Sequence, residues 1–243
     1  MSRLFVVGIG PGSAAGLTGQ ANLALDQSEI ICGYTAYVDL LRPIWPHKRY
    51  LETGMGHEVD RCRLALQAAQ QQTAALVCSG DAGVYGLAGL VYELACEYPN
   101  VEIEMVAGVT AALYGAALLG APLTQDFAVI SLSDILITWE AIEQRLYGAA
   151  AGDFVTVLYN PGSSQRKDHL RRACNILLTQ RTEDTVCGLV RNAGRAGEYS
   201  HLLTLADLRD TQVDMFTTVF IGNNATRIID GKMVTARGYE AER

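Results

Sequence analysis

A glycine-rich loop follows the first apolar run of the chain, in the stretch FVVGIGPGS at residues 5–13. Glycines at a strand end let backbone amides approach a ligand, as in the loops that hold the pyrophosphate of a dinucleotide. The spacing does not match that use, because the last glycine of G-x-G-x-x-G would fall at Ser13 and because Pro11 lacks an amide donor. No Walker G-K-[ST] follows. The sequence therefore predicts a loop for a different ligand.

Small and polar residues follow other apolar runs, at points where strands are expected to end. These loops are SGDAGVYG at 79–86, AGVTA at 107–111, YNPG at 159–162 and RNAGR at 191–195. In an open α/β sheet, ligands bind outside the carboxyl ends of the strands. We therefore expect the loops of the first half to border one crevice with GIGPG, and the second half to add its loops across a cleft between two lobes.

Each loop also has an interpretation without a ligand. Asp81 can be the N-cap of a following helix, and Thr110 can cap the next one. Arg191 and Arg195, which lie near Glu198, are equally typical of a solvated surface. The residues alone leave these alternatives open.

The histidines and cysteines, which could indicate metal binding or nucleophilic catalysis, are scattered along the chain. The chain has four histidines and six cysteines, with no C-x-x-C pair and no histidine at metal-ligand spacing beside a cysteine. We expect no metal site, and reduced, mostly buried thiols. Neither a Ser-His-Asp arrangement nor a pair of carboxylates stands out, so hydrolase chemistry of either kind has no support.

Composition restricts the class of protein. With 243 residues, 49% hydrophobic and 19% charged, the chain is expected to fold into two compact lobes. The net charge of −7 disfavours nucleic acid as a partner, because phosphates need a positive face. We find no secretory signal and no uncharged run of the ~20 residues that a membrane helix needs. A cytoplasmic protein that binds neither nucleic acid nor membranes is expected.

Hydrophobic periodicity predicts alternating strands and helices in the first half. Strands are expected at 4–9, 29–33, 74–78 and 101–106, and helices at 18–28, 58–72, 84–96 and 110–119. This order is typical of a largely parallel sheet covered by helices. Because Pro122 cannot continue the last helix, we place the domain boundary there, which makes residues 1–122 the N-terminal domain.

The second half, residues 123–243, contains more signals for antiparallel strands. The expected elements are strands at 127–132, 154–159, 185–191, 201–205 and 217–222, helices near 139–147 and 166–180, and a hairpin through Asp230 and Gly231. The predicted fold class is α/β, with two α/β domains.

Five motifs follow one another along the chain in this order: GIGPG, SGDAGVYG, GVTAA, LYNP and FTTVFIGN. Over nearly the whole chain, this combination resembles the tetrapyrrole (corrin/porphyrin) methylase family, whose members transfer methyl from S-adenosyl-L-methionine. Further stretches are similar to the precorrin-3B and cobalt-factor III C17-methyltransferases of cobalamin biosynthesis within that family. They are GYTAYVDLL, TGMGHEVDRC, ALLGAPLTQDFAVISLSD, YNPGSSQRKDHL and GLVRNAGRAGE.

The resemblance implies a reaction and an arrangement. The reaction is methylation of C17 of precorrin-3B or cobalt-factor III with contraction of the macrocycle to (cobalt-)precorrin-4, leaving S-adenosyl-L-homocysteine. The implied arrangement is two α/β domains, distinct from a Rossmann fold, with the methyl donor in the cleft between them and the chain in a homodimer. Because the sulfonium methyl is already electrophilic, alignment of donor and acceptor is expected to supply most of the acceleration.

The resemblance also implies roles for individual residues. The residues expected at the methyl donor are Pro11, Ser79, Gly80, Asp81, Val84, Tyr85, Thr110, Ala111, Tyr159, Asn160, Asn192, Thr217 and Thr218. Gly8, Gly10 and Gly12 are expected to line the tetrapyrrole trough, and a rim of Arg166, Lys167, Arg191 and Arg195 suits the substrate's carboxylates. For the proton movements of ring contraction, the expected polar groups are Ser131, Asp134, Arg191 and Glu198.

Several alternatives stay open. The chain could act at another corrin carbon, on the diphthamide precursor of a protein, or only as a tetrapyrrole carrier. A nicotinamide-dependent dehydrogenase is disfavoured by the displaced glycine. The residues do not decide whether the substrate carries cobalt. The sequence SLSD at 131–134 and the short chain favour the cobalt form.

Overall fold

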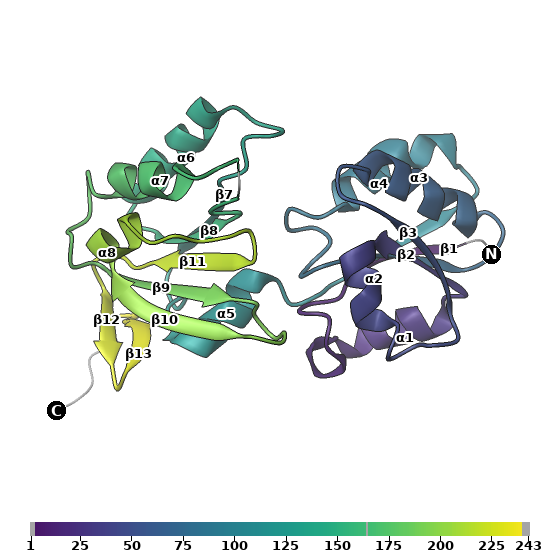
Figure 1. The fold of residues 1–243 in the computed structure, drawn as a ribbon, viewed down its shortest axis with the longest axis horizontal. Helices are drawn as coiled ribbons and strands as arrows, with labels where there is room; N and C mark the ends of the chain where they lie inside the picture. The colour runs from purple at the N-terminus through teal and green to yellow at the C-terminus, as the bar shows by residue number, and fades with distance from the viewer. Residues whose placement is uncertain (1–2, 164, 240–243) are drawn as a thin grey trace. The chain divides into compact units, whose positions relative to one another are not determined.

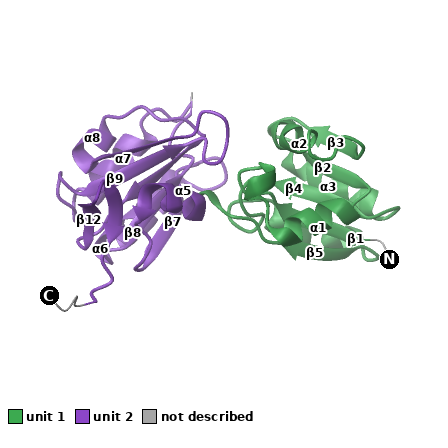
Figure 2. Cartoon of the chain, turned by 90° about the horizontal axis from the view of Figure 1, so that it is seen from below, with its two compact units in different colours: residues 1–111 green, residues 112–243 purple. Residues whose placement is uncertain are grey.

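The two halves of the chain fold as separate compact units. A computed structural model describes residues 3–163 and 165–239, and the chain divides into units of residues 1–111 and 112–243 (Figure 2). The expected boundary at residue 122 falls after helix α5 (Ala111–Leu119), whereas the units divide at the start of this helix. The helix packs within the second unit, where a β-carbon at Gly115 would lie 2.8 Å from the ring of Phe220. Because the helix packs against the second unit, the units divide before it and not at residue 122.

The first unit is built on a parallel sheet in the order β3-β2-β4-β1-β5 (Figure 1). Its elements are β1 (Arg3–Gly8), α1 (Gly19–Gln27), β2 (Ile30–Tyr34), α2 (Thr35–Leu41), β3 (Arg49–Thr53), α3 (Glu58–Ala69), β4 (Ala74–Cys78), α4 (Ala88–Leu94) and β5 (Glu102–Val106), with short 3-10 turns at Ala14–Gly16 and Ala95–Glu97. Because every strand pair is parallel, all the carboxyl ends lie at one edge of this sheet.

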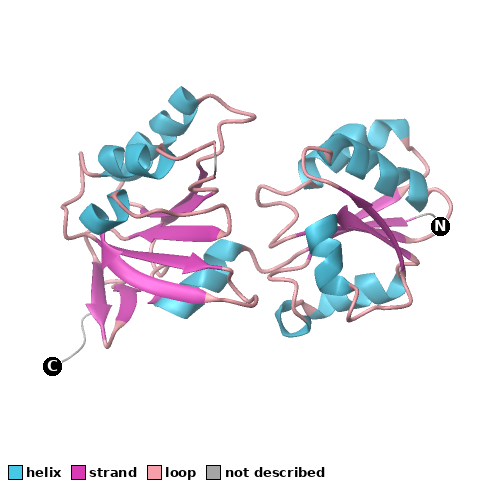
Figure 3. Cartoon of the chain, viewed as in Figure 1, coloured by secondary structure: helices cyan, strands magenta, loops and turns pink. Residues whose placement is uncertain are grey.

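Alternate residues of β1 enter two hydrophobic cores. Leu4 and Val6 pack with α3 and α4 on one face of the sheet, and Phe5 and Val7 pack with α1 and α2 on the other. Figure 3 shows the helices of this unit in cyan on both sides of its magenta strands. Strand β4 is buried along its whole length, because helices cover both faces. The continuous apolar run AALVC is the sequence signature of this double burial.

The second unit contains a mixed sheet in the order β10-β9-β11-β8-β7. Its strands are β7 (Phe127–Ser131), β8 (Val155–Tyr159), β9 (Val186–Arg191), β10 (Tyr199–Thr204) and β11 (Thr217–Ile221), and its further helices are α6 (Trp139–Ala151), α7 (His169–Leu177) and α8 (Leu205–Arg209). Strands β7 and β8 are parallel, whereas β11 is antiparallel to β8 and β9, and β10 is antiparallel to β9. The expected richness in antiparallel strands is confirmed.

Helices cover both faces of this sheet too. Val219 and Ile221 of β11 point into a core with α6, α7 and α8, while Phe220 points into a core with α5 and Met233. Met233 belongs to the hairpin of β12 (Thr226–Ile229) and β13 (Lys232–Thr235), which turns at Asp230 and Gly231 as expected and pairs with β6 (Gly120–Ala121).

Two helices begin later than periodicity predicts. Helix α4 starts at Ala88 instead of residue 84, because Tyr85 has a left-handed backbone (φ 53°) that a helix cannot contain. Helix α7 starts at His169 instead of residue 166, because Ser163 and Arg166 hydrogen-bond to each other in a turn. The short elements α2, β3, β6 and α8 were not predicted from the sequence, because each spans only two to seven residues and so gives little periodic signal.

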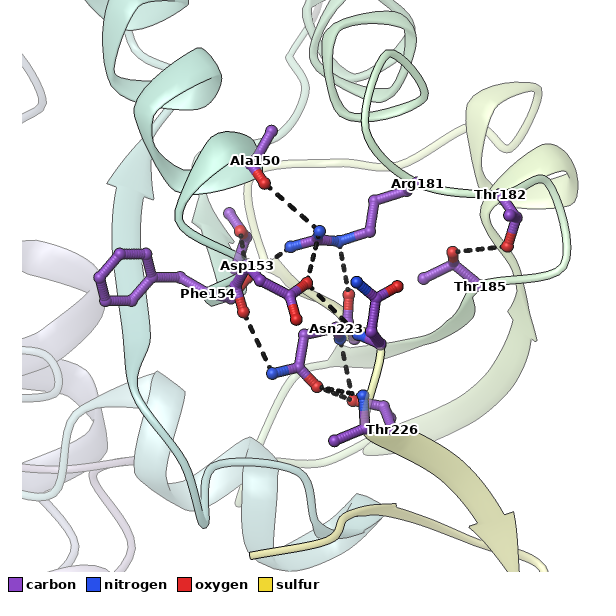
Figure 4. Close-up of polar contacts among 12 residues, drawn as sticks. Ala150, Asp153, Phe154, Arg181, Thr182, Thr185, Asn223 and Thr226 are labelled. Carbon is purple, nitrogen blue, oxygen red and sulfur yellow. Dashed lines mark hydrogen bonds and ion pairs between the residues drawn. The ribbon is translucent and has the colours of Figure 1, made fainter. Parts of the chain in front are cut away.

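A buried guanidinium joins several segments at the amino ends of the parallel strands of the second sheet (Figure 4). Arg181, whose side chain is 2% exposed, lies 2.6 Å from the carboxylate of Asp153 and donates to the carbonyl oxygens of Ala150, Phe154 and Gly222. Beside it, Asn223 donates to the carbonyl oxygen of Asp153 at 3.1 Å. Burial lowers the pKa of Arg181 while Asp153 opposes that shift. This network stabilises the edge of the second sheet that lies opposite to the carboxyl ends of β7 and β8.

Within the described residues, no helix has both the length and the apolar character that crossing a membrane requires.

Candidate functional site

Three loops of the first unit cross at the carboxyl ends of β1, β4 and β5. Gly10 and Gly80 form an antiparallel bridge, in which the amide of each residue donates to the carbonyl of the other at 2.9 and 2.8 Å. Thr18 ties in the third loop by donating from Oγ1 to the carbonyl of Ala107 at 3.1 Å. The expectation that these loops of the first half share one edge is confirmed.

Packing between the loops explains the glycines at their crossing. A β-carbon at Gly8 would lie 2.7 Å from the amide nitrogen of Gly108 and from the carbonyl oxygen of Gly80. One at Gly108 would overlap that carbonyl oxygen and lie 2.5 Å from the carbonyl carbon of Gly8. Gly10 and Gly12 have positive φ angles of 56° and 93°. These glycines are therefore required by the loops themselves, whether or not a macrocycle also lies against them.

The carboxylate of Asp81 joins two of these loops. Its Oδ1 accepts from the amide of Gly83 at 2.8 Å, and its Oδ2 accepts from the amide of Gly108 at 2.9 Å. Asp81 is not the N-cap of α4, because that helix begins seven residues later at Ala88. Both oxygens serve backbone amides, so Asp81 shapes the loops around a ligand as well as being a candidate to touch one.

Replacing Asp81 by asparagine should destabilise the first unit by about 1–3 kcal/mol, because an amide nitrogen cannot accept from the second backbone N–H. Urea unfolding measures this loss. Asp39→Asn is the matched control, since Asp39 is 59% exposed and forms a surface ion pair with Arg42 at 3.2 Å. A change of the same size in both variants would contradict the role of Asp81.

Cys78, which ends β4 immediately before the second loop, is a packing residue. Burial raises the pKa of its thiol to about 11, so the thiol stays protonated near neutral pH and is a poor nucleophile. Five of the six cysteines are buried and Cys96 is exposed.

The candidate residues of the second unit gather at one edge of its sheet. Ser131 ends β7 and lies opposite Tyr159, which ends β8. Arg191 ends β9 and lies opposite Thr217, the first residue of antiparallel β11. Because β11 lies between β8 and β9, the ends of β7, β8 and β9 and the start of β11 form a continuous row.

Hydrogen bonds fix the side chains along this row. Asn160 Nδ2 donates to Ser131 Oγ at 2.9 Å, and the amide of Ser133 donates to the same oxygen at 3.2 Å. The hydroxyl of Tyr159 accepts from the amide of Ala112 in the first turn of α5 at 2.7 Å. Ser131 is 7% exposed, so its hydroxyl holds the loop after β7 in place.

Asp214, which the sequence analysis did not single out, organises the β9 and β11 end. Its carboxylate accepts from Arg191 Nε at 2.8 Å, from Thr217 Oγ1 at 2.9 Å and from the amide of Phe216 at 3.1 Å. Burial alone would raise the pKa of Asp214, but these hydrogen bonds together lower it. The carboxylate therefore stays ionised and holds the Arg191 side chain, which is 48% exposed.

The expected basic rim is only partly on the surface. Lys167 is exposed, but Arg166 is 9% exposed, and its Nε has no hydrogen-bond partner among residues 3–163 and 165–239. Ser163 and Arg166 hydrogen-bond to each other in a turn, and the side chain of Arg166, which was expected in this rim, is buried. Glu198 accepts from the amide of Gly194 at 2.6 Å and so closes the β9–β10 turn that contains Arg195.

The remaining expected residues lie in the same loops. Pro11 is buried and packs so closely on Gly16 that a β-carbon there would lie 2.7 Å from Cδ of Pro11. Most positions expected at the methyl donor are at least partly exposed: Ser79, Gly80, Asp81, Val84, Tyr85, Thr110, Ala111, Tyr159, Asn160 and Asn192. Thr217 and Thr218 are buried. Tyr85, Asn160 and Asn192 have positive φ angles of 52–53°. Such conformations cluster at functional sites, and for Tyr85 the backbone is unusual.

Asp134 follows β7 in an exposed loop and meets a histidine. Its Oδ2 lies 3.0 Å from Nε2 of His169, the first residue of α7. Sequence reasoning gave His169 no role, because its partner lies 35 positions earlier in the chain. In the described part of the chain, no group of three or more His, Cys, Asp or Glu side chains is placed to hold a metal ion.

Comparison with known proteins identifies the family. Residues 3–209 match the family described as Tetrapyrrole (Corrin/Porphyrin) Methylases. The chain belongs to this family. The match spans both units of the methylase, and the family recognised in the motifs is confirmed.

Two curated relatives and one solved structure refine the placement of this methylase. It is 45% identical to a probable cobalt-factor III C(17)-methyltransferase of Salmonella typhimurium, over 97% of this chain and 99% of the relative. It is 38% identical to a precorrin-3B C(17)-methyltransferase of a Sinorhizobium species, over 93% and 91% of the two chains. The crystal structure of the methyltransferase CobJ superposes with a TM-score of 0.89 at 32% identity, covering 97% and 100% of the chains. The predicted α/β fold class is confirmed.

Proposed function

We propose that this methylase transfers the methyl group of S-adenosyl-L-methionine to C17 of cobalt-factor III or precorrin-3B and contracts the macrocycle. The observation that carries the proposal is the 45% identity, over nearly the full length of both chains, to the relative from Salmonella typhimurium. The higher identity to this relative than to the precorrin-3B enzyme at 38% favours the cobalt-containing substrate.

In each unit, residues at the carboxyl ends of the parallel strands suit a methyl donor that has a flat adenine base and polar groups. In the first unit, a β-carbon at Gly80 would lie in ordinary contact with Thr110, 3.5 Å from its Cα, and Gly83 is exposed beside Asp81. In the second unit, Asn160 and Asn192 place amide side chains at two strand ends. S-adenosyl-L-methionine would supply an electrophilic methyl group. The protein's residues would orient the tetrapyrrole and exclude water, with S-adenosyl-L-homocysteine as the product to be released.

Replacing Thr110 by tryptophan should weaken S-adenosyl-L-methionine binding at least about tenfold, because the added bulk lies in the loop beside Gly80. Calorimetric titration measures the affinity. The matched control is Gln71→Trp, an exposed position just before the amino end of β4 and hence at the opposite edge of the sheet. Normal titration of the Thr110 variant would refute the placement of this loop at the methyl donor.

The substrate's carboxylates suit the basic residues of the second unit. Lys167 is exposed, and the half-exposed Arg191 already binds the carboxylate of Asp214. The buried Arg166 Nε is a donor that an approaching carboxylate can use after a small movement of the turn at Ser163. We assign substrate contact to these residues and to Arg195, and place Ser131, Asp134, Arg191 and Glu198 at the reacting macrocycle.

The proposal also covers assembly and location. We propose a homodimer in the cytoplasm. Size-exclusion chromatography with light scattering tests the dimer.

The position of the new methyl group tests the reaction. Product made with S-adenosyl-L-methionine carrying a ¹³C-labelled methyl is expected to show the label on C17 in its carbon NMR spectrum. A label on another corrin carbon would overturn the C17 assignment and leave a different member of the family. Binding of the tetrapyrrole without label transfer would favour a carrier.

A further inference from the structure

A histidine and an aspartate from distant parts of the chain meet beside the carboxyl end of β7. Nε2 of His169 lies 3.0 Å from Oδ2 of Asp134, and the two side chains are 12% and 38% exposed. The histidine is thus nearly enclosed, while the carboxylate reaches solvent. Ser131, the last residue of β7, anchors the start of the same loop through Asn160.

Packing holds the imidazole in one orientation. Its ring meets the indole of Trp139 edge-on, with centroids 4.8 Å apart and an interplanar angle of 80°. Trp139 is itself 7% exposed, donates from Nε1 to Glu143 and lies under the guanidinium of Arg172 at 4.0 Å. Among the described residues, Nε2 of His169 has no hydrogen-bond partner of good geometry, and the carboxylate of Asp134 lies 3.0 Å from it.

Charges around the pair favour an ionised carboxylate. The His169 ring is the largest cause of a lowered pKa for Asp134; partial burial acts in the opposite direction, and the nearby Arg166 adds to the lowering. The other charged side chains of α6 and α7 are Glu140, Glu143, Arg145, Arg171 and Arg172, and Asp168 precedes His169. Glu143 and Arg172 pair with each other at 3.3 Å. Because its pKa is lowered, Asp134 keeps its negative charge at pH values where an ordinary aspartate is partly protonated.

We propose that His169 is a positioning residue whose imidazole holds the carboxylate of Asp134 at the carboxyl end of β7, facing the tetrapyrrole. This inference rests on the proposed function, which places Asp134 at the reacting macrocycle. An oriented, ionised carboxylate can accept a proton that the macrocycle releases during ring contraction, becoming a carboxylic acid and leaving the electron pair of the broken bond in the macrocycle. A fixed imidazole behind the carboxylate removes the cost of finding that orientation. His169 itself does not touch the substrate.

Two substitutions separate this role from packing. His169→Phe keeps an aromatic ring against Trp139 but removes Nε2, whereas His169→Gln loses the ring but carries an amide nitrogen close to the Nε2 position. If His169 positions Asp134, the glutamine variant retains more activity than the phenylalanine variant. If His169 only packs, the order is reversed, because the phenylalanine variant preserves the aromatic contact.

The experiment combines kinetics with a titration of Asp134 itself. In His169→Phe we expect kcat to fall about tenfold or more with an unchanged KM for S-adenosyl-L-methionine, and the acidic limb of the pH–rate profile to move to higher pH. Carboxyl ¹³C NMR should show the Asp134 titration moving upward in His169→Phe and less in His169→Gln.

An Asp134 titration that is identical in wild type and His169→Phe would overturn the proposal, as would a phenylalanine variant more active than the glutamine variant. Failure of the wild-type protein to methylate any tetrapyrrole would instead overturn the proposed function. The NMR titration would still decide whether His169 controls the carboxylate.

Discussion

Replacing Arg181 by methionine is expected to lower the free energy of unfolding of the second unit by about 3–5 kcal/mol. The substitution leaves the carboxylate of Asp153 without its guanidinium partner at 2.6 Å. It also removes the donors to the carbonyls of Ala150 and Phe154, between the end of α6 and the start of β8, and of Gly222, which follows β11. Buried carbonyls without donors are costly, so the loss exceeds that of an ordinary ion pair.

The matched control for Arg181 is another arginine of the same unit. Arg171 pairs with Asp210 at 3.0 Å, but the two side chains are 56% and 54% exposed, so Arg171→Met should change stability by less than about 1 kcal/mol. Urea unfolding followed by circular dichroism measures both variants. Equal losses would show that burial of Arg181 has no special effect.

Replacing Gly108 by alanine is expected to destabilise the first unit by about 3 kcal/mol or more and to weaken methyl-donor binding in parallel. The new methyl would overlap the carbonyl oxygen of Gly80 and lie 2.5 Å from the carbonyl carbon of Gly8. Both obstacles are backbone atoms: the carbonyl of Gly80 is held by the Gly10–Gly80 bridge, and Gly8 is held by the pairing of β1 with β4. Neither can move without disturbing these contacts.

A second glycine of the first unit provides the control for Gly108. A β-carbon at Gly89 meets no atom within 4 Å, and Gly89 lies inside α4. Gly89→Ala should therefore leave stability unchanged or raise it by up to about 1 kcal/mol, because alanine favours helix. Thermal unfolding and calorimetric titration of S-adenosyl-L-methionine check both variants. A Gly108→Ala protein with the melting temperature and the S-adenosyl-L-methionine affinity of the wild type would contradict the claim that the loops pack too closely here for a β-carbon.

Local patterns predicted the elements whose signals lie within a few residues. Strand β4 occupies the predicted residues, and Thr18 caps α1 through a hydrogen bond from the amide of Ala21. The start of α4 could not be predicted, because the left-handed backbone of Tyr85 depends on the surrounding loops. The packing of α5 on Phe220 depends on residues about a hundred positions away.

The candidate site was predictable where it follows from the ends of parallel strands. That rule placed the loops beginning at Gly8, Ser79 and Ala107 at one edge, and the structure confirms it for the first unit. Contacts between distant residues were not predictable. The Asp214–Arg191 hydrogen bond joins a loop to a strand, and the His169–Asp134 contact joins the first residue of α7 to a loop, with no spacing that a sequence pattern could mark.

One anaerobic incubation tests the central claim most directly: purified protein with S-adenosyl-L-methionine and cobalt-factor III, followed by product mass and absorption spectrum. We predict a gain of one methyl group together with loss of the spectrum of the intact macrocycle. A methyl gain with the macrocycle spectrum retained would contradict ring contraction, and binding without any methyl gain would contradict the proposed reaction.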